Sequence, residues 1–548
     1  MARWRLNAPD SGLVDELVSA AGVDRLCATV LANRGLAPEA VESFMSPTLK
    51  NISAPEEEVW KRAARRIAQA IKGGERIGIF GDYDTDGVTS AAVLKLALER
   101  YTDNLVVKLP TRSTGYGLLE PYVRDMFAED VRLLISADCG ISNHREVALA
   151  TDSLGMEVII TDHHLPPEEL PEAAVAVLDP KIWDEEDPLA GVGVAWKLAW
   201  AVAREMDDPE GPRHLGRLLD LVAIGTVVDI APLVGDNRTL AWMGLRYMNG
   251  GNLRLGIDSL VRAAKVRLPL SEEDLGWRIG PRINAIGRIK SAYPALELLL
   301  TNDRRRASEI SQHLNELNSE RQRRTRDAVD RCLALADPEQ DFKVVFTDEI
   351  GGIAGLIAGR VAQNTGRPTA VLHRRADGSY GGSARAGETE VNLYRALHES
   401  SAHLGEWGGH RKAAGISVPP GSLDDFTASV NAAIRRQQSE HPEVFTPAIE
   451  VDSELSMAQL TNGILDWHER LAPFGSGNYR PVFVTEGLRA HRSRRLWEGM
   501  NLLTLDEGVP AKLAGAEPPE GTFDAAYTIG RSSYTGKLEL EIVDWRRP

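Results

Sequence analysis

The sequence predicts an α/β protein built around an open, mostly parallel sheet. In the first half of the chain, short apolar runs alternate with helical stretches, as is typical of parallel sheets covered by helices. A strongly acidic turn, Gly81-Asp82-Tyr83-Asp84-Thr85-Asp86-Gly87, follows the first of these runs. Ligands of such sheets gather beyond the carboxyl ends of the strands, so this turn is expected to lie in the site.

The elements of the sheet follow from the apolar pattern. An amphipathic helix is expected at 61–72, a buried strand at 77–80 and a second helix at 88–98, before and after the acidic turn. The other expected strands of the sheet are 105–109, 131–135, 158–160 and 174–178. The glycine-rich run that begins at Gly191 fits no nucleotide-binding pattern, so we expect it to lead into a helix over 196–203.

The composition restricts the class of protein. A chain of 548 residues with 43% hydrophobic and 26% charged residues is globular and too long for one core. No apolar run could span a bilayer, and no signal-peptide core follows the first residues, so no membrane association is expected. Three dispersed cysteines, Cys27, Cys139 and Cys332, indicate a reducing, cytoplasmic location. A net charge of −16 disfavours a nucleic-acid partner when taken alone, but binding depends on local basic surface.

Acidic and imidazole side chains recur after several apolar runs. Asp138 follows 131–135, His163 and His164 follow 158–160, and Asp229 follows a further apolar stretch. Each could be an ordinary turn residue, and Asp86 could be a helix N-cap. At the ends of neighbouring strands, however, these side chains would converge on one crevice. In extended backbone the three aspartates of the acidic turn would point to one side, where a divalent cation would offset their repulsion.

Several motifs resemble those of a known family. GDYDTDG, SADCG, TDHH and GTVVDIAPL resemble the DHH phosphoesterase superfamily and, within it, the RecJ single-strand-specific exonucleases. Further stretches that resemble RecJ motifs are LPTR and GYG in 109–117, GPRINAIGR in 280–288 and GEWGGHRKAAG in 405–415. The resemblance covers most of the chain and is weakest before about residue 53 and after about residue 490.

The residue pattern and the resemblance together predict five parts. They are an N-terminal helical segment (1–53), a DHH catalytic domain (54–302), a connecting helix (303–336), a smaller α/β DHHA1 domain that binds substrate (337–440) and a β-rich, OB-like nucleic-acid-binding domain (441–548). The residue pattern agrees, because 303–336 lacks Gly and Pro, as a long helix should. The polar stretch 437–443 is expected to be a linker.

The resemblance also implies an activity and a site. The implied reaction is 5′-to-3′ hydrolysis of single-stranded DNA to mononucleotides, in DNA repair and recombination. Two Mn²⁺ or Mg²⁺ ions would activate water and stabilise charge on the phosphate. The implied metal ligands are Asp82, Asp84, Asp86, Asp138, His163 and Asp229, with Asp138 bridging both ions. The expected catalytic residues are His164, Asp138 and Asp86.

The two adjacent histidines are given different roles. In extended backbone they would point apart, so one can ligate metal while the other meets the phosphate or the leaving oxygen. We assign the metal to His163 and the substrate to His164, and we expect Asp162 to orient its neighbours. The implied substrate-binding residues are Arg112, Arg282, Arg288, Ser383, Arg385, Gly409 and His410.

Single-stranded DNA is the expected partner, and a single-strand-binding protein or a helicase is a further expected one. Two other functions remain open. The first is a different DHH-family phosphodiesterase that acts on short oligonucleotides or cyclic dinucleotides, although such relatives commonly end after the second domain. The second is a non-catalytic, RecJ-like replication scaffold, which would not need the complete ligand set.

Overall fold

The structure is a computed structural model that describes residues 2–111, 115, 117–289, 291–349, 352–497, 499–515, 517, 519–532 and 535–547. The chain forms two compact units. The first, here the parallel-sheet unit, comprises Glu42–Ser319 and Leu471–Tyr479. The second, the barrel unit, comprises Met1–Val41, Glu320–Arg470 and Arg480–Pro548. Within the described ranges, no helix combines the length and the apolar character needed to cross a bilayer.

The parallel-sheet unit is built on the sheet that the apolar runs predict. Its described strands are β2 (Arg76–Gly81), β3 (Leu105–Lys108), β4 (Val131–Ala137), β5 (Glu157–Thr161) and β6 (Ala176–Leu178). They are all parallel and lie in the order β3-β2-β4-β5-β6. Alternate residues of each strand enter two different cores, since Ile79 packs on one face and Phe80 on the other. A sheet buried on both faces explains why the strands are continuous apolar runs.

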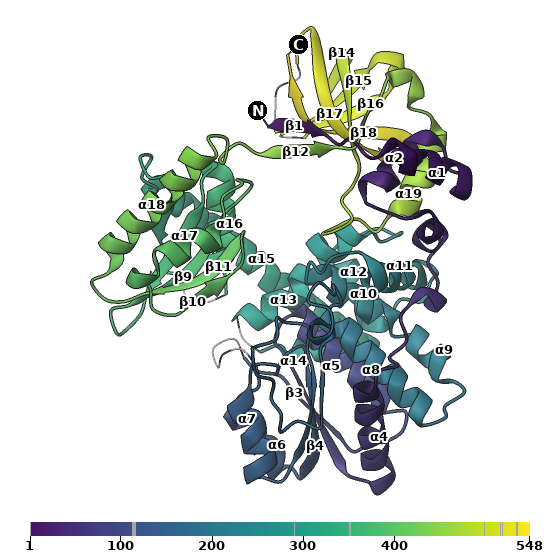
Figure 1. Ribbon diagram of the computed structural model, residues 1–548, viewed down its shortest axis with the longest axis vertical. Helices are drawn as coiled ribbons and strands as arrows, with labels where there is room; N and C mark the ends of the chain where they lie inside the picture. The colour runs from purple at the N-terminus through teal and green to yellow at the C-terminus, as the bar shows by residue number, and fades with distance from the viewer. Residues whose placement is uncertain are drawn as a thin grey trace. The chain divides into compact units, whose positions relative to one another are not determined.

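Helices cover both faces of this sheet (Figure 1). The α-helices that lie wholly within the described part of the unit are α4 (Glu58–Gly73), α5 (Thr85–Leu98), α6 (Glu120–Ala128), α7 (His144–Ala148), α8 (Gly191–Glu205), α9 (Gly211–Gly216), α10 (Leu219–Val228), α11 (Gly235–Asn249), α12 (Leu255–Ala263), α13 (Gly280–Ile289) and α14 (Tyr293–Leu300). Residues of α4, α5, α8 and α10 share one core with the sheet, and residues of α6 and α7 pack in the other. The three helices α5, α8 and α10 pack against one another, which places their ends near the carboxyl edge of the sheet.

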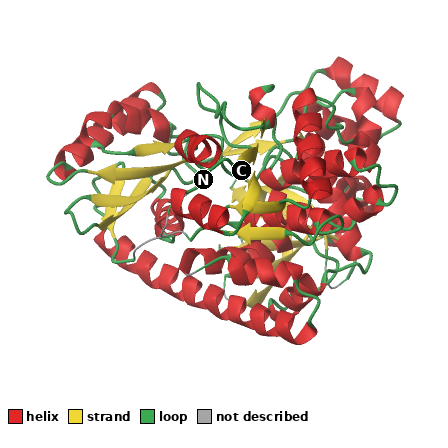
Figure 2. Ribbon diagram, turned by 90° about the horizontal axis from the view of Figure 1, so that it is seen from below, coloured by secondary structure: helices red, strands yellow, loops and turns green. Residues whose placement is uncertain are grey.

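The long helix expected over 303–336 is present. Helix α15 (Arg304–Leu335) runs for 32 residues, and Figure 2 shows it as one continuous helix. The sheet that follows it is formed, within the described residues, by β7 (Lys343–Phe346), β8 (Thr369–Arg374), β9 (Tyr380–Arg385), β10 (Trp407–Gly409) and β11 (Ala413–Val418). Helices α16 (Ala354–Thr365), α17 (Leu393–Glu399) and α18 (Leu423–Glu440) accompany this sheet. This part of the barrel unit is the second, smaller α/β domain that the resemblance predicts.

The C-terminal part is a closed barrel. Its described strands are β14 (Val482–Trp497), β15 (Met500–Leu505), β16 (Pro510–Ala514), β17 (Thr522–Arg531) and β18 (Leu538–Arg546). They pair in the order β14-β15-β16-β18-β17, and β17 pairs back to β14, which closes the barrel. A five-stranded closed barrel with this order is the OB-like fold that was expected. Helix α19 (Asn462–Leu471) and the short strands β12 (Ala448–Val451) and β13 (Ser453–Glu454) precede it.

The N-terminal segment and the expected linker each depart in part from their predictions. The first 53 residues hold helices α1 (Ser11–Ala21), α2 (Arg25–Asn33) and α3 (Val41–Met45), but they begin with a strand, β1 (Arg3–Leu6). This strand pairs with β12, and no local pattern could reveal a partner so distant in the chain. The expected linker at 437–443 begins inside helix α18, where the Gln437 side chain is buried and exchanges hydrogen bonds with the backbone of Asn392.

Candidate metal centre

Three strands of the parallel sheet end in register, and each is followed by an aspartate. Gly81 at the end of β2 pairs with Ala137 at the end of β4, which pairs with Thr161 at the end of β5. The next residues are Asp82, Asp138 and Asp162. Because their backbone N–H groups donate to the last residue of the neighbouring strand, the three aspartates lie side by side along one edge. All three are buried, with exposed fractions of 2% or less.

The acidic turn is not extended throughout. Helix α5 begins at Thr85, and Asp84 is its N-cap, with a side-chain oxygen that accepts the N–H of Gly87 at 3.1 Å. The alternative that Asp86 caps this helix is therefore wrong, and so is the expectation that alternation alone gathers the three carboxylates. Asp86 lies in the first helical turn instead and is 1% exposed. The change from strand to helix turns its carboxylate toward α8 and α10.

The glycine-rich run binds the Asp86 carboxylate. Helix α8 begins at Gly191, and the N–H groups of Gly191 and Val192 donate to the two oxygens of Asp86 at 2.8 and 2.9 Å. A helix N-terminus favours negative charge, so this arrangement stabilises the carboxylate form of Asp86. A side chain at position 191 would lie 2.5 Å from Asp138 Oδ1, so only glycine allows this approach. The glycine-rich pattern predicted the start of a helix, but not that its N–H groups bind Asp86.

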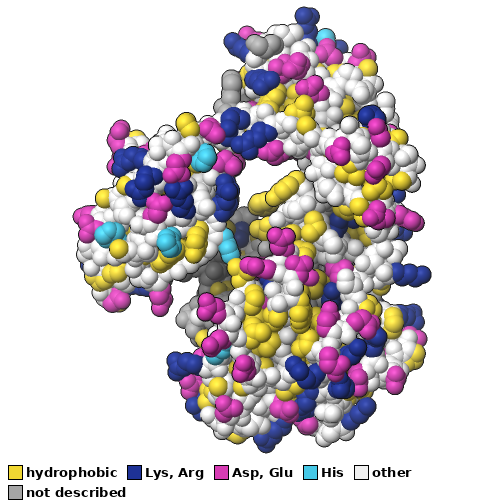
Figure 3. All heavy atoms as spheres, viewed as in Figure 1, with side chains coloured by type: hydrophobic (Ala, Val, Ile, Leu, Met, Phe, Trp, Pro, Cys, Tyr) yellow, Lys and Arg dark blue, Asp and Glu magenta, His cyan; other side chains and the backbone are white. Residues whose placement is uncertain are grey.

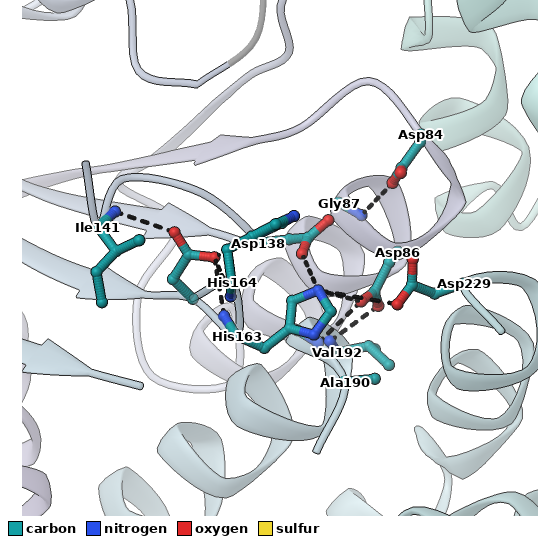
Figure 4. Close-up of polar contacts among 12 residues, drawn as sticks. Asp84, Asp86, Gly87, Asp138, Ile141, His163, His164, Ala190, Val192 and Asp229 are labelled. Carbon is teal, nitrogen blue, oxygen red and sulfur yellow. Dashed lines mark hydrogen bonds and ion pairs between the residues drawn. The ribbon is translucent and has the colours of Figure 1, made fainter. Parts of the chain in front are cut away.

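His163 joins the carboxylates into one cluster. Its Nε2 lies 3.1 Å from Asp138 Oδ1 and 3.8 Å from both Asp86 Oδ2 and Asp229 Oδ2 (Figure 4). Asp229 comes from the carboxyl end of helix α10, not from a strand of the sheet. Asp138 has a φ of 64°, a left-handed conformation that is uncommon for residues other than glycine and that often marks functional sites. Three strand ends, the N-termini of helices α5 and α8 and the C-terminus of helix α10 thus converge.

Close groups of side chains within this cluster offer ligand atoms within 4.8 Å of one another. One group is Asp82, Asp84 and Asp138, a second is Asp86, His163 and Asp229, and a third is Asp138, His163 and His164. All six predicted metal ligands therefore lie in one place. Asp138 belongs to two of the groups, which is the position that a bridging carboxylate would need.

His164 differs from His163 in its hydrogen bonds. Its Nδ1 lies 2.7 Å from Asp162 Oδ1, and Asp162 also accepts the N–H groups of Ile141, His163 and His164. The expectation that the two imidazoles point apart was wrong, because their ring centres lie 4.7 Å apart in an edge-on contact. The backbone leaves the strand after Thr161, so the alternation of a strand no longer applies. Asp162 nevertheless bonds to the His164 imidazole and to the backbone of both histidines, an arrangement that agrees with an orienting role.

Burial and crowding make this cluster electrostatically unfavourable by itself. Burial, with the charge of Asp84, raises the pKa of Asp86 to about 7. Burial and the neighbouring carboxylates raise the pKa of Asp138 and of Asp229 well above the ordinary value. Burial also lowers the pKa of His163 to about 3, so its imidazole is neutral, the form that ligates metal ions.

The two histidines therefore carry different charges at neutral pH. Burial opposes the charged form of His164, but the hydrogen bond and the charge of Asp162 raise its pKa to about 9. An array of hard oxygen donors with one neutral imidazole, whose negative charges repel one another, fits divalent cations such as Mg²⁺ and Mn²⁺.

The motif at 280–288 supports the acidic turn from outside. Asn284 on helix α13 accepts both the N–H and the hydroxyl of Thr85, at 2.9 and 2.8 Å. The predicted substrate residue Arg282 donates to Asn315 at 3.0 Å and to the carbonyl oxygen of Arg278, so it also holds α13 against α15. From the sequence a role is predicted only for the arginines of this motif, although an amide inside a recognised motif is a signal for such a support. The side chain of Arg288 and all of Arg112 lie outside the described residues.

The predicted substrate residues of the barrel unit lie on one sheet. Ser383 and Arg385 are on β9, and Arg385 pairs with Ala413 of β11. Gly409 ends β10, which pairs with β11, and His410 follows it. The Arg385 guanidinium donates to Ser383 Oγ at 2.9 Å, and within the described ranges no carboxylate pairs with it. Burial lowers the pKa of Arg385. A half-buried guanidinium that has no carboxylate partner is suited to bind a phosphate.

Three family models match this chain. The model described as DHH family, N-terminal domain, matches residues 76–226. The model described as DHHA1 domain matches 341–436, and the one described as RecJ OB domain matches 451–544. Each match lies inside one of the five expected parts, whose limits remain predictions.

Two proteins of the same name are similar to this chain over most of its length. The chain is 34% identical over 496 residues to the single-stranded-DNA-specific exonuclease RecJ of Bacillus subtilis, and the match covers 88% of this chain and 61% of that protein. It is 32% identical over 504 residues to the protein of the same name from Thermus thermophilus, covering 89% of this chain and 71% of that protein.

Two similar solved structures contain manganese. RecJ from Thermus thermophilus in complex with Mn²⁺ matches with a TM-score of 0.84 and 28% identity, over 100% of this chain and 80% of that one. A structure of exonuclease RecJ bound to manganese matches with a TM-score of 0.60 and 32% identity, over 71% of this chain and 97% of that one.

Proposed function

This chain belongs to the RecJ family, and from that premise we propose that it is a metal-dependent exonuclease that degrades single-stranded DNA from the 5′ end to mononucleotides. The observation that carries the proposal is the convergence of five aspartates and His163 at one edge of the parallel sheet. A non-catalytic scaffold would not need this costly assembly of buried carboxylates. We propose DNA repair and recombination as its cellular role.

The residues present fit two Mn²⁺ or Mg²⁺ ions. Asp82 and Asp84 would hold one ion, Asp86, His163 and Asp229 the other, and Asp138 would contact both. Such a pair of ions supplies an activated water and charge stabilisation on the phosphate and the leaving oxygen. The backbone N–H groups at the start of α8 hold both oxygens of Asp86 and limit the directions in which this carboxylate can turn.

His164 is proposed to act on the substrate. With Nδ1 bonded to Asp162 and a pKa of about 9, the imidazole carries protons on both nitrogens at neutral pH. Its Nε2–H can then donate to an anionic phosphate oxygen or give a proton to the leaving oxygen. Its side chain is 45% exposed, which leaves it accessible to a substrate.

Phosphate contacts are proposed for the basic and polar residues singled out in the sequence. Ser383, Arg385, Gly409 and His410 would bind the DNA backbone, with Arg112, Arg282 and Arg288 as further contacts. The total charge of −16 does not oppose this proposal, since Figure 3 shows basic side chains interspersed with acidic ones over the visible face. Local basic groups that release counterions would make the affinity fall steeply with salt.

The direction of degradation is the decisive test. A single strand labelled at its 3′ end should shorten progressively and release the label last, whereas a strand whose 5′ end carries a bulky block should persist. Double-stranded DNA should resist. Early release of the 3′ label, or equal attack on blocked and circular strands, would contradict 5′-end chemistry. Activity only on short oligonucleotides or cyclic dinucleotides would favour the other class of DHH phosphodiesterase.

The setting of the activity belongs to the same proposal. We propose a cytoplasmic location, with which three free, buried cysteines agree. A single-strand-binding protein or a helicase is proposed as a protein partner, because both deal with the single strand that the enzyme would degrade. Faster degradation in the presence of either purified protein would support that partner.

A further inference from the structure

We propose that Asn237 is a positioning residue for the metal centre and that it sets the affinity of the Asp86–His163–Asp229 group for its ion. The inference rests on the proposed function, because it concerns the metal ions of that same site. It singles out a residue that lies outside the ligand set. Asn237 is completely buried in the first turn of helix α11.

One amide side chain ties two loops together. Asn237 Nδ2 donates to the carbonyl oxygens of Pro188 and Pro232, the latter at 3.1 Å. Its Oδ1 accepts the backbone N–H of Ala190 at 3.1 Å. Within the described residues, each hydrogen bond of the Asn237 side chain therefore goes to the backbone, and no metal-ligating side chain is among its partners. The two loops that it joins lie before helix α8 and after helix α10.

The first loop leads directly to Asp86. Ala190 is the N-cap residue of α8, and the two N–H groups that follow it, those of Gly191 and Val192, hold the Asp86 carboxylate. A shift of Ala190 would move both donors together, because they belong to the same helical turn. The bond from Ala190 to Asn237 therefore determines where this turn meets the carboxylate.

The second loop carries Asp229. Pro232 follows Asp229 by three residues, and the intervening Ile230 has a φ of 62°, which is strained for a β-branched residue. A strained turn of this kind persists only where surrounding contacts hold it. Asn237 supplies one such contact at Pro232, and Leu233 supplies the next, since its N–H donates to the carbonyl oxygen of Ser476 at 2.7 Å. Asn237 thus couples the positions of Asp86 and Asp229, which share His163 as a neighbour.

The test replaces the two donors of this amide. In Asn237→Asp the size and the acceptor remain, but a carboxylate faces two carbonyl oxygens and cannot donate to them. Asn237→Ser is a second, smaller change that leaves room for water. Asn431→Asp is the matched control, because Asn431 in helix α18 is also buried, accepts one backbone N–H from Phe342 and donates to two carbonyl oxygens.

The readout is Mn²⁺ binding to the metal-free protein, measured by calorimetry and by the electron paramagnetic resonance of free Mn²⁺. Wild-type protein should bind two ions, and His163→Ala identifies the binding step that belongs to the Asp86–His163–Asp229 group. Both Asn237 variants should weaken that step by about 10-fold and leave the other step unchanged. This is the lower end of the effect of removing a group that hydrogen-bonds to a ligand, because Asn237 acts on Asp86 through the backbone of α8. Asn431→Asp should change neither step.

The outcomes separate this inference from the proposed function. Two unchanged binding steps in both Asn237 variants would overturn the positioning role alone. Equal weakening of both steps, or similar weakening in Asn431→Asp, would show general destabilisation and would also overturn it. If wild-type protein bound no Mn²⁺, the proposed function would fail, and the positioning role would fail with it.

Discussion

Replacing Asp84 with asparagine should stabilise the metal-free protein, yet make it less stable than wild type once Mn²⁺ is bound. Asp84 caps helix α5 by accepting the N–H of Gly87, and asparagine caps helices about equally well. The substitution therefore keeps the helix and removes one negative charge. Burial is the largest cause of the raised pKa of Asp86, and the negative charge of Asp84 is the second.

The size of the effect follows from Asp86. A rise in its pKa from 3.8 to about 7 corresponds to about 4 kcal/mol, at about 1.36 kcal/mol for each pH unit. The sign is fixed because the unfolded chain releases this proton near pH 4, whereas the folded chain keeps it until about pH 7. The free energy of unfolding therefore falls as the pH rises through this interval. Burial is the larger cause, so removal of the Asp84 charge should restore about 1–2 kcal/mol at pH 8.

The assay is thermal unfolding between pH 5 and pH 8, with and without Mn²⁺, while hydrogen exchange of the α5 amides localises the change. Without metal, the Asp84→Asn variant should match wild type at pH 5 and exceed it at pH 8. With Mn²⁺ the order should reverse, because a bound ion stabilises the complete ligand set more. The control is Asp24→Asn, which makes the same exchange of a helix cap away from the cluster. Asp24 caps α2 by accepting the N–H of Cys27 at 2.8 Å. Equal stabilities at pH 8 without metal, or no reversal with Mn²⁺, would refute the electrostatic reasoning.

Other variants test the remaining assignments. Asp138→Ala and His163→Ala should each abolish metal-dependent hydrolysis while the circular dichroism spectrum stays native, and a wild-type rate from either would remove that residue from the site. His164→Ala should lower kcat by about 10²- to 10⁴-fold and still bind two Mn²⁺, whereas loss of an ion would make His164 a ligand. Arg385→Ala should raise KM, and the slope of log affinity for DNA against log salt concentration should fall by about one counterion. An unchanged slope would place the phosphate contact elsewhere. His468 is buried, and burial lowers its pKa to about 3. As the pH falls from about 6.5 toward 3, this histidine is protonated in the unfolded chain but not in the folded one, so the free energy of unfolding should fall. His468→Gln should flatten this part of the thermal unfolding profile, and an unchanged profile would show that other groups dominate it.

Much of the architecture could be predicted from local patterns. The apolar runs at 77–80 and 131–135 became β2 and β4, because a parallel sheet that is buried on both faces needs continuous apolar strands. The absence of Gly and Pro over 303–336 predicted helix α15, because these residues interrupt helices wherever they occur. The acids that follow the strands were informative because parallel strands end at a common edge.

The geometry of the site was decided by contacts between distant segments. The approach of α8 to Asp86 joins residues more than 100 positions apart, and the same is true of Asn284 and Thr85. Asp229 reaches the cluster from the end of a helix. The apolar run before it is short, and from its length alone a helix cannot be told from a strand.

Asp236, Asn237 and Arg238 illustrate the same limit. Three polar residues at a helix start indicate a solvated turn, yet Asn237 and Arg238 are buried. By itself the sequence determined the candidate metal ligands, through residue type and motif, and placed Asp82, Asp138 and His163 after strands of one sheet, through local periodicity. The tertiary structure alone decided their distances, charges and supports, because hydrogen bonds between loops and helix ends form only after the helices have packed.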